Sequence, residues 1–278
     1  MTPASTTDDS IFDIEMHLLL EAVFLRYHQD FRHYASSSTK RRLRHALDVF
    51  ECSSLSALQE RILRDSTAFA RFVSFLTIGV SEMFRDASFF RALREAVVPI
   101  LATYPSLKIW VAGCSTGEEV YSLAILLREE GLGDRTMIYA TDIDAEALDR
   151  AQSGIYPLEK LASFSEAYLA AGGRHSLSEY YTAGERSVIF DRTLREGVLF
   201  SDHSLATDGV FTEVELVTCR NVLIYFDRIL QDRALCLFRD SLCTHGFLGL
   251  GSKESLRYSA HADAFVDFCR EERIYRRR

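Results

Sequence analysis

The stretch KIWVAGCSTGEEVY, residues Lys108–Tyr121, decides the fold. Its β-branched and aromatic residues predict a strand, its glycines predict a turn, and the apolar run that follows predicts a helix. Gly113 and Gly117 lack a Cβ, so the backbone can approach a ligand closely there. Ser115 and Thr116 add hydroxyl groups beside exposed amides. A strand, a glycine turn and a helix in this order are typical of a nucleotide-cofactor site.

The turn carries neither of the common phosphate-binding patterns. GxxxxGK[ST] and GxGxxG are both absent, and Glu118 and Glu119 place negative charge where a phosphate would lie. S-adenosylmethionine (SAM) has a sulfonium and an ammonium group and no phosphate, so it suits an acidic turn better than ATP or NAD does. Any doubly wound fold can carry glycines after its first strand, so this turn alone leaves a purely structural role open.

A second strand supports the cofactor interpretation. Thr136–Thr141 reads as a short buried strand that stops at Asp142 and Asp144, before a helical pattern over Ala145–Gln152. An acidic side chain at the end of the second strand can accept hydrogen bonds from ribose hydroxyls. We therefore predict that Asp142 binds a ribose and that Asp144 caps the helix.

The composition describes a globular chain. Its 278 residues, 47% of them hydrophobic, suffice for one large domain and a small one. The six cysteines show no CxxC and no Cys/His ligand spacing, so we expect no zinc or other metal site and no disulfide scaffold. Residues 1–10 lack a signal-peptide pattern and no apolar run of about 18 residues occurs, which predicts a soluble cytoplasmic protein without membrane insertion.

The charge is negative but uneven. A net charge of −8 argues against a nucleic-acid partner. Between Phe31 and Phe50, however, there is a single acidic residue, Asp48, and there are five basic residues, Arg32, Lys40, Arg41, Arg42 and Arg44. Apolar residues recur there at helical spacing, at Leu43, Ala46, Leu47 and Phe50. The basic face is either an ordinary solvated surface or a docking site for an acidic partner.

The chain divides near residue 75. The first part predicts helices without strands, over Ile11–Tyr27, Thr39–Phe50, Leu55–Asp65 and Ser66–Phe75. Later segments alternate between strands and helices, which indicates an α/β fold with a largely parallel sheet. Further strands are expected at Gly197–Phe200, Val214–Cys219, Phe247–Gly251 and Arg273–Arg277. A helix over Glu118–Glu130 follows the glycine turn, and another over Asp227–Cys243 is bounded by Asp227 and Gly246.

Four motifs in order resemble the CheR family of SAM-dependent protein-glutamate O-methyltransferases, which methylate bacterial chemoreceptors. They are LTIGVSEMFRD (76–86), GCSTGEEVYSLAI (113–125), YATDIDAEALDRAQSGIYP (139–157) and LVTCRNVLIYFD (216–227). The segment FRHYASSSTKRRLRHAL resembles the helical N-terminal signature of that family. The resemblance implies a class I SAM-dependent methyltransferase fold, Rossmann-like, with a mostly parallel seven-stranded sheet. It places an all-α domain at 1–75, a connecting segment at 76–91, the catalytic domain at 92–278 and a small β-hairpin subdomain at 177–200.

The resemblance also implies site residues. The cofactor contacts would be Gly79, Ser81, Arg85, Gly113, Glu118, Asp142, Ser204, Leu205, Arg220 and Asn221. Arg85 and Tyr225 would lie beside the transferring methyl group. The basic helix, through Lys40, Arg41 and Arg44, would bind an acidic helical protein substrate such as a chemoreceptor.

This sequence departs from the family pattern at three places. Gly79 and Ser204 stand where chemoreceptor methyltransferases typically or often have Asn, so water or backbone is expected to replace a side-chain contact to the cofactor. The predicted hairpin near Gly184 lacks the glycine-rich loop that holds a receptor tether in some members. Docking through a tether is therefore not predicted.

The chemistry that the resemblance implies is modest. A glutamate γ-carboxylate, with a pKa of about 4.3, is already ionised at neutral pH and needs no general base. Arg85 would orient this carboxylate and Tyr225 would shape the channel. Arg85 could instead pair with Asp86 or Glu82, and Tyr225 could be a core aromatic residue. Alternatives to the function are a SAM-binding sensor or scaffold, another acceptor carboxylate or small molecule, and a nicotinamide oxidoreductase.

Overall fold

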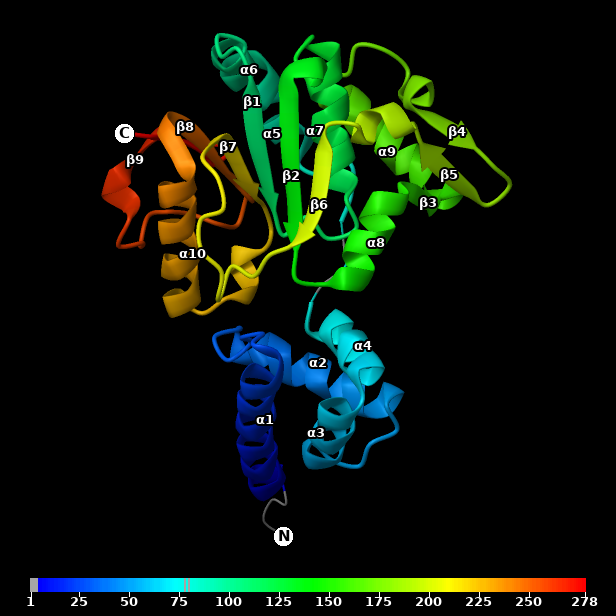
Figure 1. Ribbon diagram of the computed structural model, residues 1–278, viewed down its shortest axis with the longest axis vertical. Helices are drawn as coiled ribbons and strands as arrows, with labels where there is room; N and C mark the ends of the chain where they lie inside the picture. The colour runs from blue at the N-terminus through cyan, green and yellow to red at the C-terminus, as the bar shows by residue number, and fades with distance from the viewer. Residues whose placement is uncertain (1–4, 78, 80) are drawn as a thin grey trace.

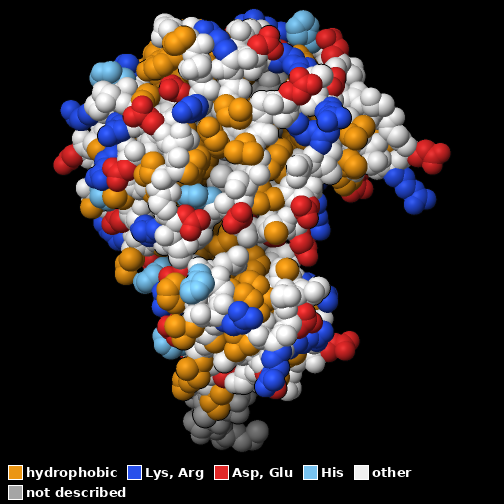
Figure 2. Space-filling model, in the orientation of Figure 1, with side chains coloured by type: hydrophobic (Ala, Val, Ile, Leu, Met, Phe, Trp, Pro, Cys, Tyr) orange, Lys and Arg blue, Asp and Glu red, His pale blue; other side chains and the backbone are white. Residues whose placement is uncertain are grey.

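The computed structural model of the protein describes residues 5–77, 79 and 81–278, and residues 1–4 of the expected helical domain lie outside that range. Two bodies are stacked along the long axis of the molecule (Figure 1). A helical domain at the N-terminus lies at the carboxyl ends of the parallel strands of a larger domain, which is built on a sheet. In the space-filling view the small antiparallel sheet overhangs a notch above the helical domain, and acidic and basic side chains are interspersed (Figure 2).

Four helices form the N-terminal domain, as the periodicity predicts. They are α1 (Ser5–Tyr27), α2 (Ser36–Val49), α3 (Leu55–Arg64) and α4 (Ser66–Leu76), so α1 begins earlier than Ile11, its expected start. The side chains of Ser54 and Asp65 accept hydrogen bonds from amides in the first turns of α3 and α4. The apolar face of α2 packs inward, with Leu43 and Ala46 fully buried. None of the helices in the described ranges has the length and apolarity that crossing a membrane requires.

The larger domain is centred on a seven-stranded sheet with the order β6-β2-β1-β7-β8-β10-β9. The strands are β1 (Leu107–Ala112), β2 (Thr136–Asp142), β6 (Val198–Asp202), β7 (Val214–Cys219), β8 (Leu242–Leu250), β9 (Phe265–Cys269) and β10 (Ile274–Arg277). The pairings among β6, β2, β1, β7 and β8 are all parallel, and only β10 pairs antiparallel with its two neighbours. The mostly parallel seven-stranded sheet is thus confirmed.

Helices cover both faces of the sheet. Side chains alternate between the two faces along each strand, and apolar residues of β1 are buried on both. Ile109 and Val111 of β1 join the core that α7 (Glu118–Glu129) covers, whereas Trp110 joins the core under α10 (Arg228–Ser241). The remaining helices are α5 (Ala87–Ala92), a π-helical turn η1 (Leu93–Val97), α6 (Val98–Leu101), α8 (Ala145–Ser153) and α9 (Leu161–Ala170). Of these, the sequence analysis predicted α8 but not α5, η1, α6 or α9.

The predicted end of α10 was wrong. The helix stops at Ser241 and β8 starts at once with Leu242, so Gly246 lies inside a strand and does not end the helix. A Cβ at Gly246 would come within 3.1 Å of the carbonyl oxygen of Glu215 on the neighbouring strand β7. The glycine therefore allows close strand packing at this point.

The predicted hairpin is part of a separate three-stranded antiparallel sheet. Its order is β3-β5-β4, formed by β3 (Ile155–Pro157), β4 (Tyr181–Ala183) and β5 (Ser187–Phe190). The hairpin β4–β5 falls within the expected segment 177–200, whereas β3 is contributed by residues just after α8. Three residues are too few to show a periodic pattern, which is why β3 was not predicted.

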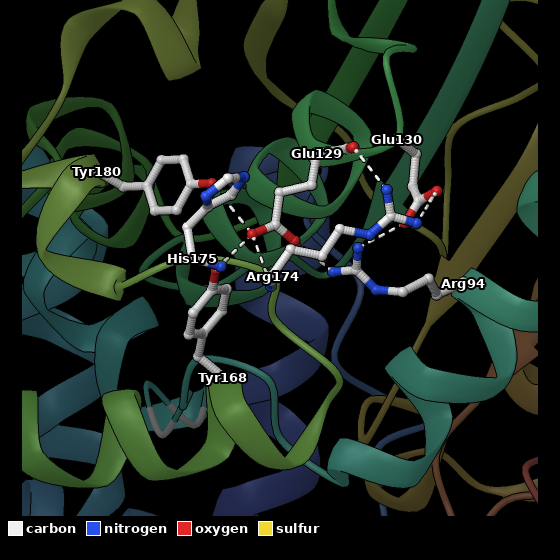
Figure 3. A network of polar contacts seen from close by, with 7 residues as sticks. All are labelled: Arg94, Glu129, Glu130, Tyr168, Arg174, His175 and Tyr180. Carbon is white, nitrogen blue, oxygen red and sulfur yellow. Dashed lines mark hydrogen bonds and ion pairs between the residues drawn. The ribbon is translucent and has the colours of Figure 1, made fainter.

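A buried polar network anchors this subdomain to the far end of α7 (Figure 3). The guanidinium group of Arg94 in η1 pairs at 2.6 Å with both Glu129 and Glu130, and the Glu129 side chain is 1% exposed. Tyr168 of α9 and Tyr180 donate hydroxyl hydrogen bonds to the Glu129 carboxylate. Burial alone would raise the pKa of Glu129, but the hydrogen bonds from Tyr168 and Arg94 outweigh burial and leave that pKa lowered.

We expect Glu129→Gln to lower the free energy of unfolding at neutral pH by about 1–3 kcal/mol, because the buried Arg94 then keeps only Glu130 as a charged partner. Since the folded-state pKa of Glu129 is lowered, its contribution is fully present above the unfolded-state pKa and is lost as the pH falls through the folded-state pKa. Urea unfolding of wild type and variant should therefore converge at acid pH. Glu60→Gln, which breaks an exposed pair with Arg64, should have little effect at any pH. Equal stability of wild type and Glu129→Gln at neutral pH would contradict this role for the network.

Candidate active site

A pocket that is open to solvent lies where the helical domain meets the carboxyl ends of the parallel strands. Tyr34, Arg42 and Leu76 line it from the helical domain. The turns after β1, β2, β6 and β7 line it from the sheet domain. This edge of an open parallel sheet is where such folds bind ligands.

The turn after β1 forms one wall. Gly113 has φ +73°, and a Cβ there would lie 2.5 Å from a methyl carbon of Val222, so only glycine fits. Ser115 also adopts a left-handed backbone, with φ 49°. Its amide donates to the Asp142 carboxylate at 2.7 Å, while its own hydroxyl oxygen is buried without a partner among the described residues.

Asp142 lies at the end of β2 and lines the pocket, as predicted for a ribose ligand. Its carboxylate accepts hydrogen bonds from the amides of Ser115 and Asp144, at 2.7 and 3.0 Å. Burial raises the pKa of Asp142, and these two amides act in the opposite direction. Asp144 caps α8 as predicted, since its side chain accepts from the amides of Glu146 and Ala147.

The two glutamates of the turn have different surroundings. Glu118 was one of the expected cofactor contacts, but it lies outside the pocket lining and its side chain is 1% exposed. Its carboxylate pairs with Lys160 at 3.1 Å and accepts a hydrogen bond from the Thr116 hydroxyl at 2.6 Å. Glu119 lines the pocket instead. One step along a helix turns a side chain by about 100°, so the first turn of α7 directs only one of the two toward the ligand.

Arg220, at the end of β7, is a buried residue of the pocket lining with partners on two other segments. Its side chain is 1% exposed, and it forms ion pairs with Asp86 at 2.9 Å and Glu119 at 3.0 Å. It also donates to the carbonyl oxygen of Arg85 at 2.7 Å, and its guanidinium group stacks over Phe89 at 4.1 Å. Arg220 lines the pocket as predicted, and it also fixes the segment that carries Arg85.

Arg85 faces the pocket from a constrained turn. The residues on either side of it, Phe84 and Asp86, have left-handed φ values of 49° and 56°. Among the described residues Arg85 forms no ion pair, and Asp86 is engaged by Arg220. The alternative of a local salt bridge is therefore not what the structure shows. Gly79 and Ser81, on the same connecting segment, also line the pocket.

The turn after β7 depends on a residue that the sequence analysis missed. Asn221 lines the pocket with a left-handed φ of 62°. The buried carboxylate of Glu254 accepts hydrogen bonds from the amides of Asn221 at 2.9 Å, Gly251 at 2.7 Å and Ile224 at 3.3 Å. Glu254 stands in an irregular segment after β8, so no periodic or motif signal could have identified it.

The turn after β6 contributes differently from the prediction. Leu205 lines the pocket, but Ser204 does not. The Ser204 hydroxyl accepts from the amide of Ala206 at 3.3 Å and the Ser204 amide donates to Asp208 at 2.9 Å, so the side chain serves its own turn. His203, which was not predicted, lines the pocket next to Asp142.

Tyr225 lines the pocket at the contact between the two domains. The guanidinium group of Arg42, from α2, lies over its ring at 4.9 Å. Arg42 is 9% exposed and donates to the carbonyl oxygen of Leu76, while its other terminal nitrogen, Nη2, has no partner among the described residues. Burial lowers the pKa of Arg42 from its ordinary value.

Backbone contacts hold this junction. Tyr34 and Phe226 form an isolated antiparallel bridge. The amide of Ala35 donates to the carbonyl oxygen of Tyr225 at 2.7 Å, and the amide of Asp227 donates to the carbonyl oxygen of His33 at 2.8 Å.

The three basic residues expected to bind substrate lie outside the pocket lining. Lys40 pairs with Asp13 at 2.6 Å and Arg44 pairs with Asp9 at 2.9 Å, both on α1. Arg41 is exposed and forms no ion pair among the described residues. The basic side chain of α2 that reaches the pocket is Arg42, which the sequence analysis counted in the charge run but did not select.

The lining fits SAM. Within the described residues, buried polar atoms without a partner occur on four of the lining residues, Arg42, Ser115, His203 and Arg220, and a polar ligand would satisfy them. The lining carries four acidic side chains, Glu82, Glu119, Asp142 and Asp144, against three arginines, and this balance favours a ligand with cationic groups over one with phosphates. No cluster of three or more metal-ligating side chains is present in the part of the chain that the structure describes.

Comparison with known proteins identifies the family. Residues 14–77 match the family description "CheR methyltransferase, all-alpha domain", and residues 79–270 match "CheR methyltransferase, SAM binding domain". A Pseudomonas putida protein that carries the name methyltransferase Cher3 is 56% identical, over 98% of this chain and 99% of its own. Proteins named chemotaxis protein methyltransferase are 30% identical in Listeria innocua, over 80% of this chain and 83% of theirs, and 31% identical in Salmonella typhimurium, over 75% and 68%. The chain therefore belongs to the CheR family and is a SAM-dependent methyltransferase.

Proposed function

We propose that this methyltransferase transfers the methyl group of SAM to the γ-carboxylate of glutamate residues on an acidic helical segment of a chemoreceptor or related signalling protein. The names of the relatives support a role in chemotaxis. The observation that carries the proposal is that one pocket is lined by Arg85 from the connecting segment and by Arg42 from the helical domain, whose guanidinium group lies over Tyr225. Two guanidinium groups are suited to an incoming carboxylate.

The order of the strands suggests how the cofactor lies. The sheet order places β2 between β1 and β6, so Asp142 lies between the glycine turn and His203. With the ribose on Asp142, the methionine end lies toward Glu119 and Arg85, and the base lies toward β6. The carboxylate of Glu119 suits the cationic groups of that methionine end.

When bound, SAM supplies a methyl carbon made electrophilic by the sulfonium group. The acceptor carboxylate is ionised, so the residues of the chain have to align it and exclude water, and they need not remove a proton. Alignment of this kind can contribute about 7–11 kcal/mol in well-oriented reactions. Arg85 holds the carboxylate from the sheet side, Arg42 holds it from the helical side, and the Tyr225 ring fixes the Arg42 guanidinium group.

The substrate contacts α2 at two residues, the exposed Arg41 on the surface and the buried Arg42 in the pocket. Lys40 and Arg44 already have partners on α1, so an acidic helix gains less from them than from the exposed Arg41. Arg41 attracts the substrate helix and Arg42 receives the carboxylate within the pocket. This arrangement replaces the set of Lys40, Arg41 and Arg44 that the charge pattern suggested.

The decisive test is methylation of a chemoreceptor cytoplasmic fragment with tritiated SAM. Carboxyl methyl esters release volatile counts in base, which distinguishes them from methylation at nitrogen. Arg85→Ala should abolish this release while cofactor affinity changes less than tenfold, because Arg85 acts mainly on the acceptor. Arg85→Lys, which keeps the charge but not the paired hydrogen bonds, should retain partial activity. Near-normal release by Arg85→Ala would remove Arg85 from the mechanism, and base-stable counts in wild type would refute carboxyl methylation.

Asp142→Ala should weaken binding of S-adenosylhomocysteine, the product, by about 1–3 kcal/mol, because the ribose hydroxyls lose their acceptor. Titration calorimetry measures the difference. The matched control is Asp202→Ala, since Asp202 is the register partner of Asp142 at the end of β6 but is exposed and outside the pocket lining. Equal loss in both variants, or none in Asp142→Ala, would exclude Asp142 from ribose binding.

Arg41→Glu should raise KM for the receptor fragment and leave cofactor affinity unchanged, because Arg41 is exposed and lies outside the cofactor pocket. The attraction should also weaken with salt, since the Debye length falls from about 10 Å at 0.1 M to about 3 Å at 1 M. Arg44→Glu, whose wild-type side chain is already paired with Asp9, should raise KM less. An unchanged KM for Arg41→Glu at low salt would show that α2 is only a solvated face.

A further inference from the structure

His203 is held rigidly in the pocket wall at the end of β6. Its amide donates to the carbonyl oxygen of Asp142 at 3.2 Å. Its ring packs edge-on against Trp110 and Phe211, with ring centroids 5.2 and 5.3 Å apart. A side chain constrained by backbone pairing and by two aromatic rings presents its nitrogen atoms in a fixed direction.

The hydrogen bonding of the ring defines which nitrogen can accept. Nε2 lies 3.1 Å from the carbonyl oxygen of Gly209, which can only accept, so Nε2 carries the proton. In the neutral ring Nδ1 is then an acceptor. This Nδ1 is buried and has no partner among the described residues, on a residue that lines the pocket. A buried acceptor without a partner is costly unless a ligand completes it.

No other side chain of this turn is suited to the same contact. Ser204 lies outside the pocket lining, with its hydroxyl on the amide of Ala206. Leu205, 7% exposed, offers only an apolar surface. The polar group available at the end of β6 is therefore the His203 imidazole.

We propose that His203 Nδ1 accepts a hydrogen bond from the exocyclic amino group of the SAM adenine and so determines the preference for this base. The proposal rests on the cofactor orientation argued above, with the ribose on Asp142 at the end of β2 and the base toward β6, the adjacent strand. Leu205 packs against the flat face of the base.

The test compares two ligands by titration calorimetry. One is S-adenosylhomocysteine, and the other is its analogue with unsubstituted purine in place of adenine, which differs only by the amino group. Wild type should prefer S-adenosylhomocysteine by roughly tenfold or more, and His203→Phe should reduce the ratio to within about threefold. His203→Asn, which can place an amide oxygen near the position of Nδ1, should restore part of the preference.

Ser204→Ala is the matched control and should keep the wild-type ratio. A preference that survives in His203→Phe, or one that disappears in Ser204→Ala, would overturn the proposal. If His203→Phe does not fold, as judged by thermal unfolding, the affinity ratio of the two ligands is compared between His203→Asn and Ser204→Ala. A smaller ratio in His203→Asn supports the proposal, and equal ratios overturn it. Absence of S-adenosylhomocysteine binding in wild type would instead refute the cofactor site, which separates the two failures.

Discussion

The buried charge of Arg220 is the constraint on which the pocket depends. A guanidinium group that is 1% exposed has to be paired, because an isolated charge in the interior is very costly. Its partners come from the start of α7 and from the connecting segment, which are far apart in the chain. Satisfying one charge thus fixes both the glutamate that lines the pocket and the backbone segment that carries Arg85.

The sequence predicted the parallel strands and the cofactor edge well, because these depend on local patterns. The run before Gly113 and the acid at Asp142 carry their own signals, since buried strands are apolar and their carboxyl ends bind ligands. The motifs also identified Arg220, although its role in fixing Arg85 emerged only from the fold. The sequence analysis did not predict the strand β9. This strand pairs only with β10 and is partly exposed, so its residues do not show a clear alternation of buried and exposed side chains.

Other features could not be read from the sequence because they depend on tertiary geometry. Adjacent glutamates at 118 and 119 are chemically identical, and only the phase of α7 separates them. Lys40 and Arg44 look like free charges until α1 places Asp13 and Asp9 beside them. Arg42 appears to be one more member of a charge run, but its side chain lies over Tyr225 and reaches the carbonyl of Leu76. In each case the missing information was the direction of a side chain relative to a distant segment.

The antiparallel bridge between Tyr34 and Phe226 has a consequence for how the family can diversify. The helical domain and the turn after β7 share main-chain hydrogen bonds, so neither can be replaced without the other adjusting its register. Surface residues of α1 and α2 are free of that restriction. Under the proposed function, target choice can therefore evolve on these outer helices, while the reaction geometry is inherited as one unit drawn from both domains.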